Sequence, residues 1–273
     1  MQTVTVKGVE IPVLGLGTWP MSGASCVRAV TEALKLGYRH VDTAQMYGNE
    51  AEVGEGLRAS GLPRDEVFVT TKVQRHLTSA KAMPKSVEES VRALGLDSVD
   101  LLLAHWPNPS VPVAETVGAL SEMKRRGLAR NIGVSNYTVA LVDEAVRSSP
   151  EPLIVNQIEY HPFIDQTKVI DANRRHGLVT TAYSPIARGR VIGSGPIEAI
   201  ARARGRTPIQ VTLRWIIQQE GVVAIPKSTH TERLKENLAI FDFALTDDEM
   251  ERIGALGGNR HIVNDRSSVA RWD

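Results

Sequence analysis

The sequence predicts an α/β protein that folds as an eight-stranded (β/α)8 TIM barrel, with an amino-terminal β-hairpin at the bottom and a carboxyl-terminal tail over the top. Short apolar runs alternate with segments of helical periodicity, and this order is typical of parallel strands joined by helical crossovers. Polar residues that end three of these runs, Asp42, Lys72 and His105, lie 30 and 33 residues apart. At 273 residues, the chain has the length of one barrel, and we expect a single domain over residues 1–273.

The first expected element is the hairpin, whose strands 3–6 and 11–13 flank the glycine-containing turn segment 7–10. Short apolar or β-branched runs then mark the barrel strands. In chain order they cover residues 14–17, 40–42, 67–72, 99–104, 132–134, 154–158, 179–182 and 222–225.

Helices are expected between these strands because apolar residues recur there every three or four positions, as Val27, Val30 and Leu34 do. Capping boxes also predict where helices begin. The two boxes pair Ser86 with Glu89 and Thr246 with Glu249.

Composition narrows the functional classes. The chain is 42% hydrophobic and 23% charged, and its net charge of +1 argues against nucleic acid or an anionic membrane as the main partner. Cys26 is the only cysteine, so no internal disulfide can form, which suits a reducing compartment. The amino terminus lacks the pattern of a signal peptide, and no apolar stretch is long enough to span a membrane. We therefore expect a cytoplasmic protein.

Four ionisable side chains are expected at one rim of the barrel. Asp42, Lys72 and His105 each close or directly follow a strand, and Tyr47 lies five positions after Asp42. The carboxyl ends of barrel strands meet at the face that carries the chemistry in such folds. Together, these groups could donate a proton.

Lys72 follows a largely apolar strand, so its ammonium group needs a counter-charge, and Asp42 on the neighbouring strand can supply one. A structural ion pair at the barrel mouth is the competing interpretation. Tyr47 favours catalysis, because a phenol has a pKa of about 10 and a nearby lysine cation is expected to lower it. His105 could orient a carbonyl oxygen, although an isolated histidine is more often a packed core residue.

The later strand ends carry uncharged hydrogen-bonding groups, which suit a planar ring that bears an amide, although ordinary loop polarity gives the same pattern. They are Ser135, Asn136, Gln157, Tyr183 and Ser184. After the last strand, Lys227, Ser228 and Arg233 flank a helix start and could bind an anion, unless this is a solvated basic loop.

The sequence lacks the motifs of several other nucleotide-binding and metal-dependent protein families. It contains no glycine-rich nucleotide fingerprint, no P-loop and no H-E-x-x-H motif. His40 and Asp42 alone are too few to hold a metal, so a metal-dependent hydrolase barrel would lack its ligands and we expect no metal.

The chain resembles the aldo-keto reductases over essentially its whole length. The matching segments are 15–19, 42–50, 71–72, 105–107, 133–136, 156–157 and 225–237. Within the family, the short chain and the ending Arg271-Trp272-Asp273 resemble the bacterial 2,5-diketo-D-gluconate reductase branch, especially its B type.

This resemblance implies an NADPH-dependent, monomeric carbonyl reductase that acts on small or sugar-derived aldehydes and ketones, such as 2,5-diketo-D-gluconate or methylglyoxal. It implies that Tyr47 donates the proton, that Lys72 and Asp42 tune it, and that His105 orients the carbonyl. Trp19, Tyr47, His105 and Trp106 would contact substrate. The cofactor would be bound by Gly17, Thr18, Asp42, Ser135, Asn136, Gln157, Tyr183, Ser184, Ile186, Arg188, Ile225, Lys227, Ser228, Arg233, Glu236 and Asn237.

Two positions depart from the family pattern. Arg188 stands where relatives often have a smaller polar residue, and His230 is unusual in the phosphate loop. A non-catalytic NADP-binding regulatory subunit of the same fold is the alternative function. The tail 257–273 is expected to present an arginine (Arg260, Arg266 or Arg271) or His261 to carboxylated substrates, unless its charges are simply solvated.

Overall fold

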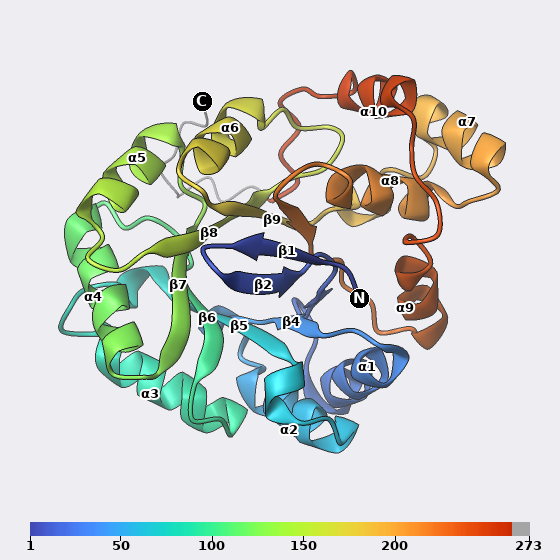
Figure 1. The fold of residues 1–273 in the computed structure, drawn as a ribbon. Helices are drawn as coiled ribbons and strands as arrows, with labels where there is room; N and C mark the ends of the chain where they lie inside the picture. The colour runs from blue at the N-terminus through green and yellow to red at the C-terminus, as the bar shows by residue number, and fades with distance from the viewer. Residues whose placement is uncertain (264–273) are drawn as a thin grey trace.

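Eight parallel strands curl into a barrel surrounded by helices (Figure 1). The structure is a computed structural model and describes residues 1–263. The strands pair in chain order, and hydrogen bonds from Gly15 N to Ala224 O and from Ala224 N to Val13 O, each 2.9 Å, join the last strand to the first. The predicted fold class is confirmed. The strands are β3 (Leu16–Gly17), β4 (His40–Asp42), β5 (Phe68–Val73), β6 (Val99–Ala104), β7 (Ala129–Ser135), β8 (Leu153–Glu159), β9 (Val179–Tyr183) and β10 (Val222–Ala224).

The hairpin β1 (Thr3–Val6) and β2 (Val9–Pro12) has a shorter turn than the sequence predicted. Val6 pairs directly with Val9, so Lys7 and Gly8 alone form the turn. Both have positive φ, 48° and 81°, as a two-residue turn between right-handed twisted strands requires. The expected turn 7–10 was therefore wrong, because Val9 and Glu10 belong to the second strand.

The hairpin packs across the amino end of the barrel, where it crosses the centre of the view in Figure 1. Val6 and Ile11 belong to the same apolar cluster as Leu101 and Leu103 of β6, whereas Leu102 packs with the helices. This alternation along one strand separates a barrel interior from an outer core. The hairpin therefore closes the bottom of the barrel and leaves the carboxyl rim for the site.

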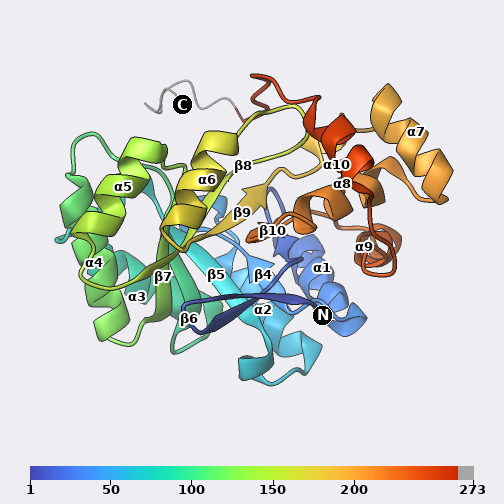
Figure 2. The same ribbon diagram turned by 45° about the horizontal axis from the view of Figure 1, so that its top comes forward.

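Helices cover the outside of the barrel, and two of them, α7 and α8, occupy the connection between β9 and β10 (Figure 2). The helices are α1 (Gly23–Leu36), α2 (Glu50–Ser60), α3 (Met83–Leu94), α4 (Val113–Arg125), α5 (Val139–Ser148), α6 (Thr167–Arg175), α7 (Gly195–Arg204), α8 (Pro208–Ile217), α9 (Thr231–Leu238) and α10 (Asp247–Gly254). Short 3₁₀ turns are η1 (Gln45–Tyr47), η2 (Arg64–Glu66), η3 (Arg75–Leu77) and η4 (Ala187–Gly189).

Of the two predicted capping boxes, one marks the start of a helix and the other does not. Thr246 and Glu249 form the expected box at the start of α10. Ser86 does not, because α3 begins at Met83 and Ser86 lies inside it, donating a hydrogen bond to Met83 O at 2.9 Å. Pro84 explains the earlier start, since proline is favoured in the first turn of a helix.

The described part of the tail returns over the end of β8. Asp165 N donates to Gly258 O at 2.8 Å, and Asn259 forms an antiparallel bridge with Ile164. The rest of the tail, including Arg266 and Arg271, lies outside the described residues. Across residues 1–263, the structure contains no helix with the length and apolar character needed to cross a membrane.

Candidate active site

Asp42 and Lys72 form a buried ion pair at the carboxyl ends of β4 and β5. Their atoms Oδ1 and Nζ lie 2.5 Å apart, and both side chains are at most 2% exposed. Lys72 Nζ also donates to Thr43 O at 2.9 Å. Burial alone would lower the pKa of Lys72, but the charge of Asp42 and the contact with Tyr47 raise it. The ammonium group therefore stays charged and fixed in place.

Tyr47 is placed against this pair by the 3₁₀ turn η1, which follows β4. Lys72 Nζ lies 3.4 Å from Tyr47 Oη. The pKa of Tyr47 is raised, because burial of the phenol outweighs the opposing effect of Lys72. The expectation of a lowered pKa was therefore wrong in net direction. A raised pKa keeps Tyr47 protonated at neutral pH, which is the form that a proton donor needs.

His105 directly follows β6 and packs edge-on against Tyr47, with the ring centroids 5.7 Å apart. Burial and the Lys72 cation lower the pKa of His105 to about 3, so the imidazole is neutral. Its Nδ1 atom is buried and has no hydrogen-bond partner within residues 1–263. A neutral imidazole can donate one N–H to a carbonyl oxygen without adding a charge.

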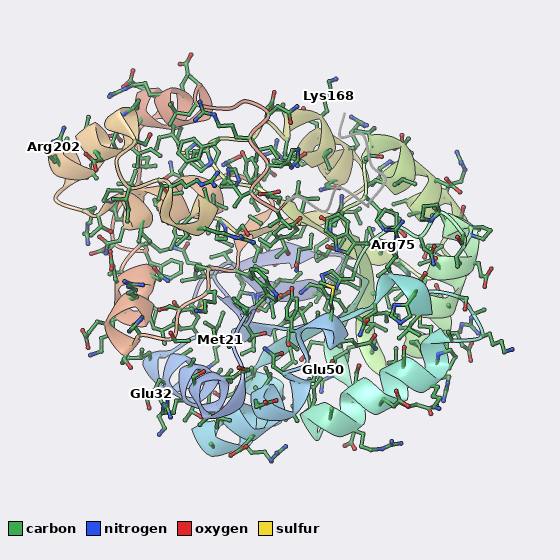
Figure 3. All side chains as sticks on the ribbon, turned by 180° about the vertical axis from the view of Figure 1, so that it is seen from behind. Met21, Glu32, Glu50, Arg75, Lys168 and Arg202 are labelled. Carbon is green, nitrogen blue, oxygen red and sulfur yellow. The ribbon has the colours of Figure 1, made fainter. Side chains whose placement is uncertain are left out.

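Two residues near this group escaped sequence reasoning. Thr43 supplies the backbone oxygen for Lys72, and Glu50 accepts a hydrogen bond of 2.5 Å from Thr71 Oγ1. Burial raises the pKa of Glu50. Glu50 begins α2 and lies toward the carboxyl rim, on the face seen in Figure 3. Thr43 and Glu50 both lie in segment 42–50, which carries the family resemblance, but the resemblance assigned no role to either residue.

The residues predicted to bind an amide come together and bond to one another. Tyr183 Oη donates to Asn136 Oδ1 at 2.8 Å, and Asn136 Nδ2 donates to His105 O at 2.9 Å. Ser135 Oγ donates to Gln157 O at 2.9 Å. Asn136 has a positive φ of 63°, which asparagine tolerates better than most residues. This network therefore holds the side chains of Tyr183, Asn136 and Ser135 beside His105, while Gln157 takes part in it through its backbone oxygen.

Gln157 also reaches the charged group. Its Nε2 donates to Asp42 Oδ2 at 2.8 Å, and both side chains are buried. Asp42 thus accepts from Lys72 on one oxygen and from Gln157 on the other. Sequence reasoning placed Asp42 in both the catalytic set and the cofactor set and paired it with Lys72, but it did not predict the contact with Gln157.

The loop after β9 approaches the loop after β3. Ser184, Ala187 and Arg188 all have positive φ, between 49° and 53°, a strained arrangement that is common at ligand clamps. The Arg188 guanidinium lies over the Trp19 ring, 5.0 Å from its centroid. Trp19 is 46% exposed, and Trp106 is partly buried beside His105.

Beyond β10, the predicted anion site has two exposed cations. Neither Lys227 nor Arg233 pairs with a carboxylate of the described chain. Ser228 is buried, and its hydroxyl donates to His230 O and accepts from His230 N. These groups lie at the start of α9, so an anion there would meet two positive side chains that no carboxylate of residues 1–263 neutralises.

The neighbouring residues of the predicted cofactor set differ in availability. Glu236 Oε1 accepts a hydrogen bond of 2.5 Å from Thr207 Oγ1, so helix α8 already engages it. Asn237, Thr18 and Ile225 are buried, and Ile186 is partly buried. A Cβ atom on Gly17 would lie 2.7 Å from Ile225 O, so only glycine allows this close approach of the two loops.

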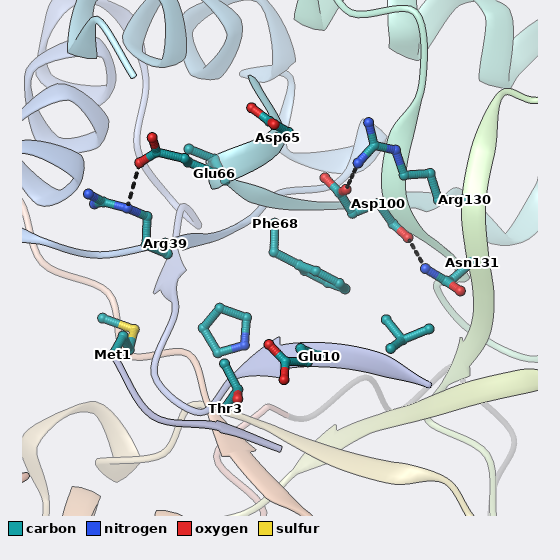
Figure 4. Close-up of a pocket in the computed structure, with 13 residues that line it drawn as sticks. Met1, Thr3, Glu10, Arg39, Asp65, Glu66, Phe68, Asp100, Arg130 and Asn131 are labelled. Carbon is teal, nitrogen blue, oxygen red and sulfur yellow. Dashed lines mark hydrogen bonds and ion pairs between the residues drawn. The ribbon is translucent and has the colours of Figure 1, made fainter. Parts of the chain in front are cut away.

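A cavity of about 410 Å³ lies at the opposite end of the barrel, between the hairpin and the amino ends of β5 and β6 (Figure 4). Four of the charged side chains that line it form two ion pairs: Arg130 with Asp100 at 3.1 Å, and Arg39 with Glu66 at 3.6 Å. None of the predicted site residues lines it. Within residues 1–263, no group of three or more histidine, cysteine or acidic side chains is arranged to hold a metal ion.

A sequence profile described as the Aldo/keto reductase family matches residues 13–257. The chain belongs to this family. It is 42% identical over 250 residues to an aldo-keto reductase from Mycobacterium sp. (strain MCS), covering 91% of this chain and 88% of that protein. It is also 40% identical over 269 residues to methylglyoxal reductase DkgB of Salmonella typhi, covering 97% and 100%.

Solved structures agree with this membership. A protein provisionally named 2,5-diketo-D-gluconic acid reductase B superimposes with a TM-score of 0.97 at 48% identity, covering 100% of this chain and 98% of that one. The aldo-keto reductase AKR2E4 of Bombyx mori, solved in complex with NADP, gives a TM-score of 0.90 at 31% identity, covering 97% and 96%. This family member is an oxidoreductase that acts on carbonyl compounds.

Proposed function

We propose that this protein reduces aldehydes and ketones with NADPH and that Tyr47 is the proton donor. The observation that carries the proposal is the position of Lys72, which contacts Asp42 at 2.5 Å and Tyr47 at 3.4 Å beside His105. These groups lie at the carboxyl rim, where barrel enzymes carry their chemistry.

The direction of the Tyr47 proton follows from Lys72. An ammonium group only donates hydrogen bonds, so the phenolic oxygen must accept from it. The phenol's own hydrogen is then free to point to a carbonyl oxygen. Once Tyr47 has given up this proton, the Lys72 cation stabilises the phenolate.

His105 would orient the carbonyl group. Its neutral imidazole can donate an N–H to the oxygen, and an uncharged donor does not compete with Tyr47 for the role of acid. A donor that is fixed in advance stabilises the negative charge that develops on this oxygen. Trp19 and Trp106 would form apolar walls of the substrate site.

The residues present fit a nicotinamide dinucleotide phosphate. Bound NADPH would supply the hydride. Tyr183 would stack on the nicotinamide ring, and Ser135, Asn136 and Gln157 would bind its carboxamide. Lys227, Ser228 and Arg233 would hold the 2′-phosphate. The loops near the pyrophosphate and adenosine would contribute Gly17, Thr18, Ser184, Ile186, Arg188, Ile225, Glu236 and Asn237, although Glu236 would have to share its carboxylate with Thr207.

The relatives suggest the substrate class. One is named a methylglyoxal reductase and another a diketogluconic acid reductase, so we include small dicarbonyls and sugar-derived keto acids among the substrates. Neither the site nor these relatives supports a non-catalytic regulatory subunit. On sequence grounds, we also propose that the protein acts as a cytoplasmic monomer.

Replacing Tyr47 with phenylalanine tests the central assignment. Because the ring remains and the transferable proton is lost, turnover of NADPH with methylglyoxal should fall at least about 100-fold. NADPH affinity, measured by fluorescence, should hardly change. If the variant kept its turnover, Tyr47 would not be the proton donor, and the neutral state assigned to His105 would also be in question.

The cofactor assignment is tested separately with Arg233→Ala. Since Arg233 would face a doubly charged 2′-phosphate, the KM for NADPH should rise roughly tenfold or more, and that for NADH should stay nearly constant. Arg202→Ala removes an exposed arginine from α7 at the outer edge of the molecule (Figure 3) and should leave both constants unchanged. Equal use of the two cofactors by the wild type would contradict this assignment.

A further inference from the structure

One hydrogen bond joins the cofactor side of the proposed site to its proton-donor side. Gln157 Nε2 donates to Asp42 Oδ2 at 2.8 Å, and both side chains are at most 2% exposed. We propose that Gln157 is a positioning residue for the proton donor, because it couples the seating of a nicotinamide carboxamide to Asp42 and, through Lys72, to Tyr47. This inference rests on the proposed function.

The bond crosses the inside of the barrel. Asp42 ends β4 and Gln157 lies near the end of β8, and three strands separate these two in the sheet. The main chain at Gln157 is held separately, because its carbonyl oxygen accepts from Ser135 Oγ and from Asn136 N at 2.9 and 2.8 Å. Its side chain is therefore free to serve Asp42.

Asp42 fixes which way the Gln157 amide points. A carboxylate only accepts hydrogen bonds, so the amide must turn its NH₂ group toward Asp42. The Oε1 atom then faces away from Asp42 and can accept an N–H. A nicotinamide carboxamide would consequently donate to Gln157 and direct its own oxygen to other donors.

Acceptance of that N–H would change the proton donor's surroundings. Hydrogen bonds in a chain polarise one another, so the Gln157 amide would become a better donor to Asp42. The charge of Asp42 opposes phenolate formation at Tyr47, whereas that of Lys72 favours it. A stronger bond to Asp42 therefore favours phenolate.

Other titratable groups face this chain of contacts. His40 lies on β4, and burial lowers its pKa; Glu50 bonds to Thr71 on β5, and burial raises its pKa. His105 is neutral beside Tyr47. Within residues 1–263, no hydrogen bond joins His40 or Glu50 to Gln157. Their influence on Tyr47 should stay constant when Gln157 alone is changed.

The test compares Gln157→Leu, and Gln157→Met as a longer substitute should leucine prevent folding, with Ser135→Ala. Ser135 contacts Gln157 O but not Asp42, so its loss should weaken the carboxamide grip alone. The pH profile of alcohol oxidation with NADP⁺ reports the phenolate. In the Gln157 variants, its midpoint should rise by roughly half a unit, a threefold loss of kcat/KM below the midpoint, while Ser135→Ala should keep the wild-type midpoint.

A binding measurement without turnover provides the second readout. In Asp42→Asn, the Gln157 amide is no longer held in one orientation and can rotate by 180°. This variant should therefore bind NADPH roughly fivefold more weakly, the value of one hydrogen bond. The same change should have little effect in a Gln157→Leu background, because nothing remains to be oriented. Fluorescence titration of the four proteins gives this coupling directly.

The outcomes separate the two proposals. If Gln157 variants weaken NADPH binding without moving the midpoint, and the Asp42 effect persists, then Gln157 only binds the carboxamide and the coupling is wrong. If neither Ser135→Ala nor the Gln157 variants change NADPH affinity, then the carboxamide site of the proposed function fails, and the coupling fails with it. A shifted midpoint together with lost Asp42 dependence supports the coupling.

Discussion

At Lys72, a single ammonium group makes three contacts that determine the chemistry of the rim. It is fully buried and bonds to Asp42 Oδ1, Thr43 O and Tyr47 Oη. A buried cation without a partner would destabilise the fold, so Asp42 is needed to balance the charge of Lys72. The same charge stabilises the phenolate form of Tyr47. The site is thus arranged around one fixed positive charge.

The state of His105 gives a prediction about pH. Its pKa of about 3 lies far below the ordinary value of 6.5, because burial and the Lys72 cation both disfavour the protonated ring. The imidazole should therefore stay neutral from pH 5 upward. We expect kcat/KM for carbonyl reduction to show no inflection between pH 5 and 8, when measured at saturating NADPH.

The variant Lys72→Met supplies the contrast for that profile. Without the cation, one of the two causes of the low pKa disappears, so any inflection should move upward toward 6.5. An inflection near 6.5 in the wild type would mean that His105 titrates as a solvated histidine and does not occupy this buried position.

The sequence predicted which residues lie at the rim better than it predicted which side chains contact one another. Asp42, Lys72 and His105 were placed together because parallel strands present their ends at one rim, and the structure brings them together with Tyr47. The bond between Gln157 and Asp42 joins residues 115 positions apart across the barrel, and no pattern in the sequence gives a side-chain direction over that distance.

At the scale of elements, the end of β8 holds the tail. Glu159 is 1% exposed and accepts from Ile262 N at 2.6 Å and Val263 N at 3.1 Å. His161 Nδ1 accepts from Phe163 N, so the proton on Nε2 can be donated to Glu159 Oε1 at 3.3 Å. His261, one of the four tail residues considered as candidates to face the substrate pocket, contacts Glu159 at 3.2 Å.

This attachment should depend on the charge of Glu159. Burial alone would raise the pKa of Glu159, but the hydrogen bonds it accepts outweigh burial and lower it below its ordinary value of 4.5. The stabilisation is therefore present above pH 4.5 and is lost as the pH falls through the lowered pKa. Glu159→Gln should remove about 1.5–3 kcal/mol of local stability at neutral pH.

Hydrogen exchange at the amides of Ile262 and Val263 measures this loss, and exchange there should accelerate by roughly tenfold or more in Glu159→Gln. Asp100→Asn is the matched control. It alters another buried carboxylate, bonded to Arg64 and Arg130 at the opposite end of the barrel. Equal acceleration in both variants would show that the tail responds only to global stability.

The boundaries of helices and strands were predicted correctly where only one local sequence signal applied. Strands 40–42 and 99–104 were placed correctly, because turn residues and helical segments flank them. The capping signal at Ser86 failed because Pro84 favours an earlier start, and in the hairpin the strand propensity of Val9 overrode the assumed turn. Two local rules competed at each of these places.

For the whole molecule, closure of the barrel joins the proposed substrate and cofactor regions. Gly17 N donates to Pro226 O at 3.0 Å, which ties the loop after β3 to the loop after β10. Thr18 and Trp19 follow on one side and Lys227 on the other. The number of strands predicted closure, but the atomic fit at Gly17 depends on two backbones that the sequence does not place.

Gly17→Ala tests this closure. The added Cβ atom would lie 2.7 Å from Ile225 O, so one of the two loops must move, at a cost of about 1–3 kcal/mol. We expect Tm to fall by roughly 2–10 °C and NADPH to bind more weakly, as measured by calorimetry and fluorescence titration.

Gly118→Ala is the matched control, because a Cβ atom there has no neighbour within 4 Å and alanine favours the helix interior of α4. That variant should keep or raise Tm with unchanged NADPH affinity. If both variants behaved alike, the close contact between Gly17 and Ile225 would not limit how the barrel closes.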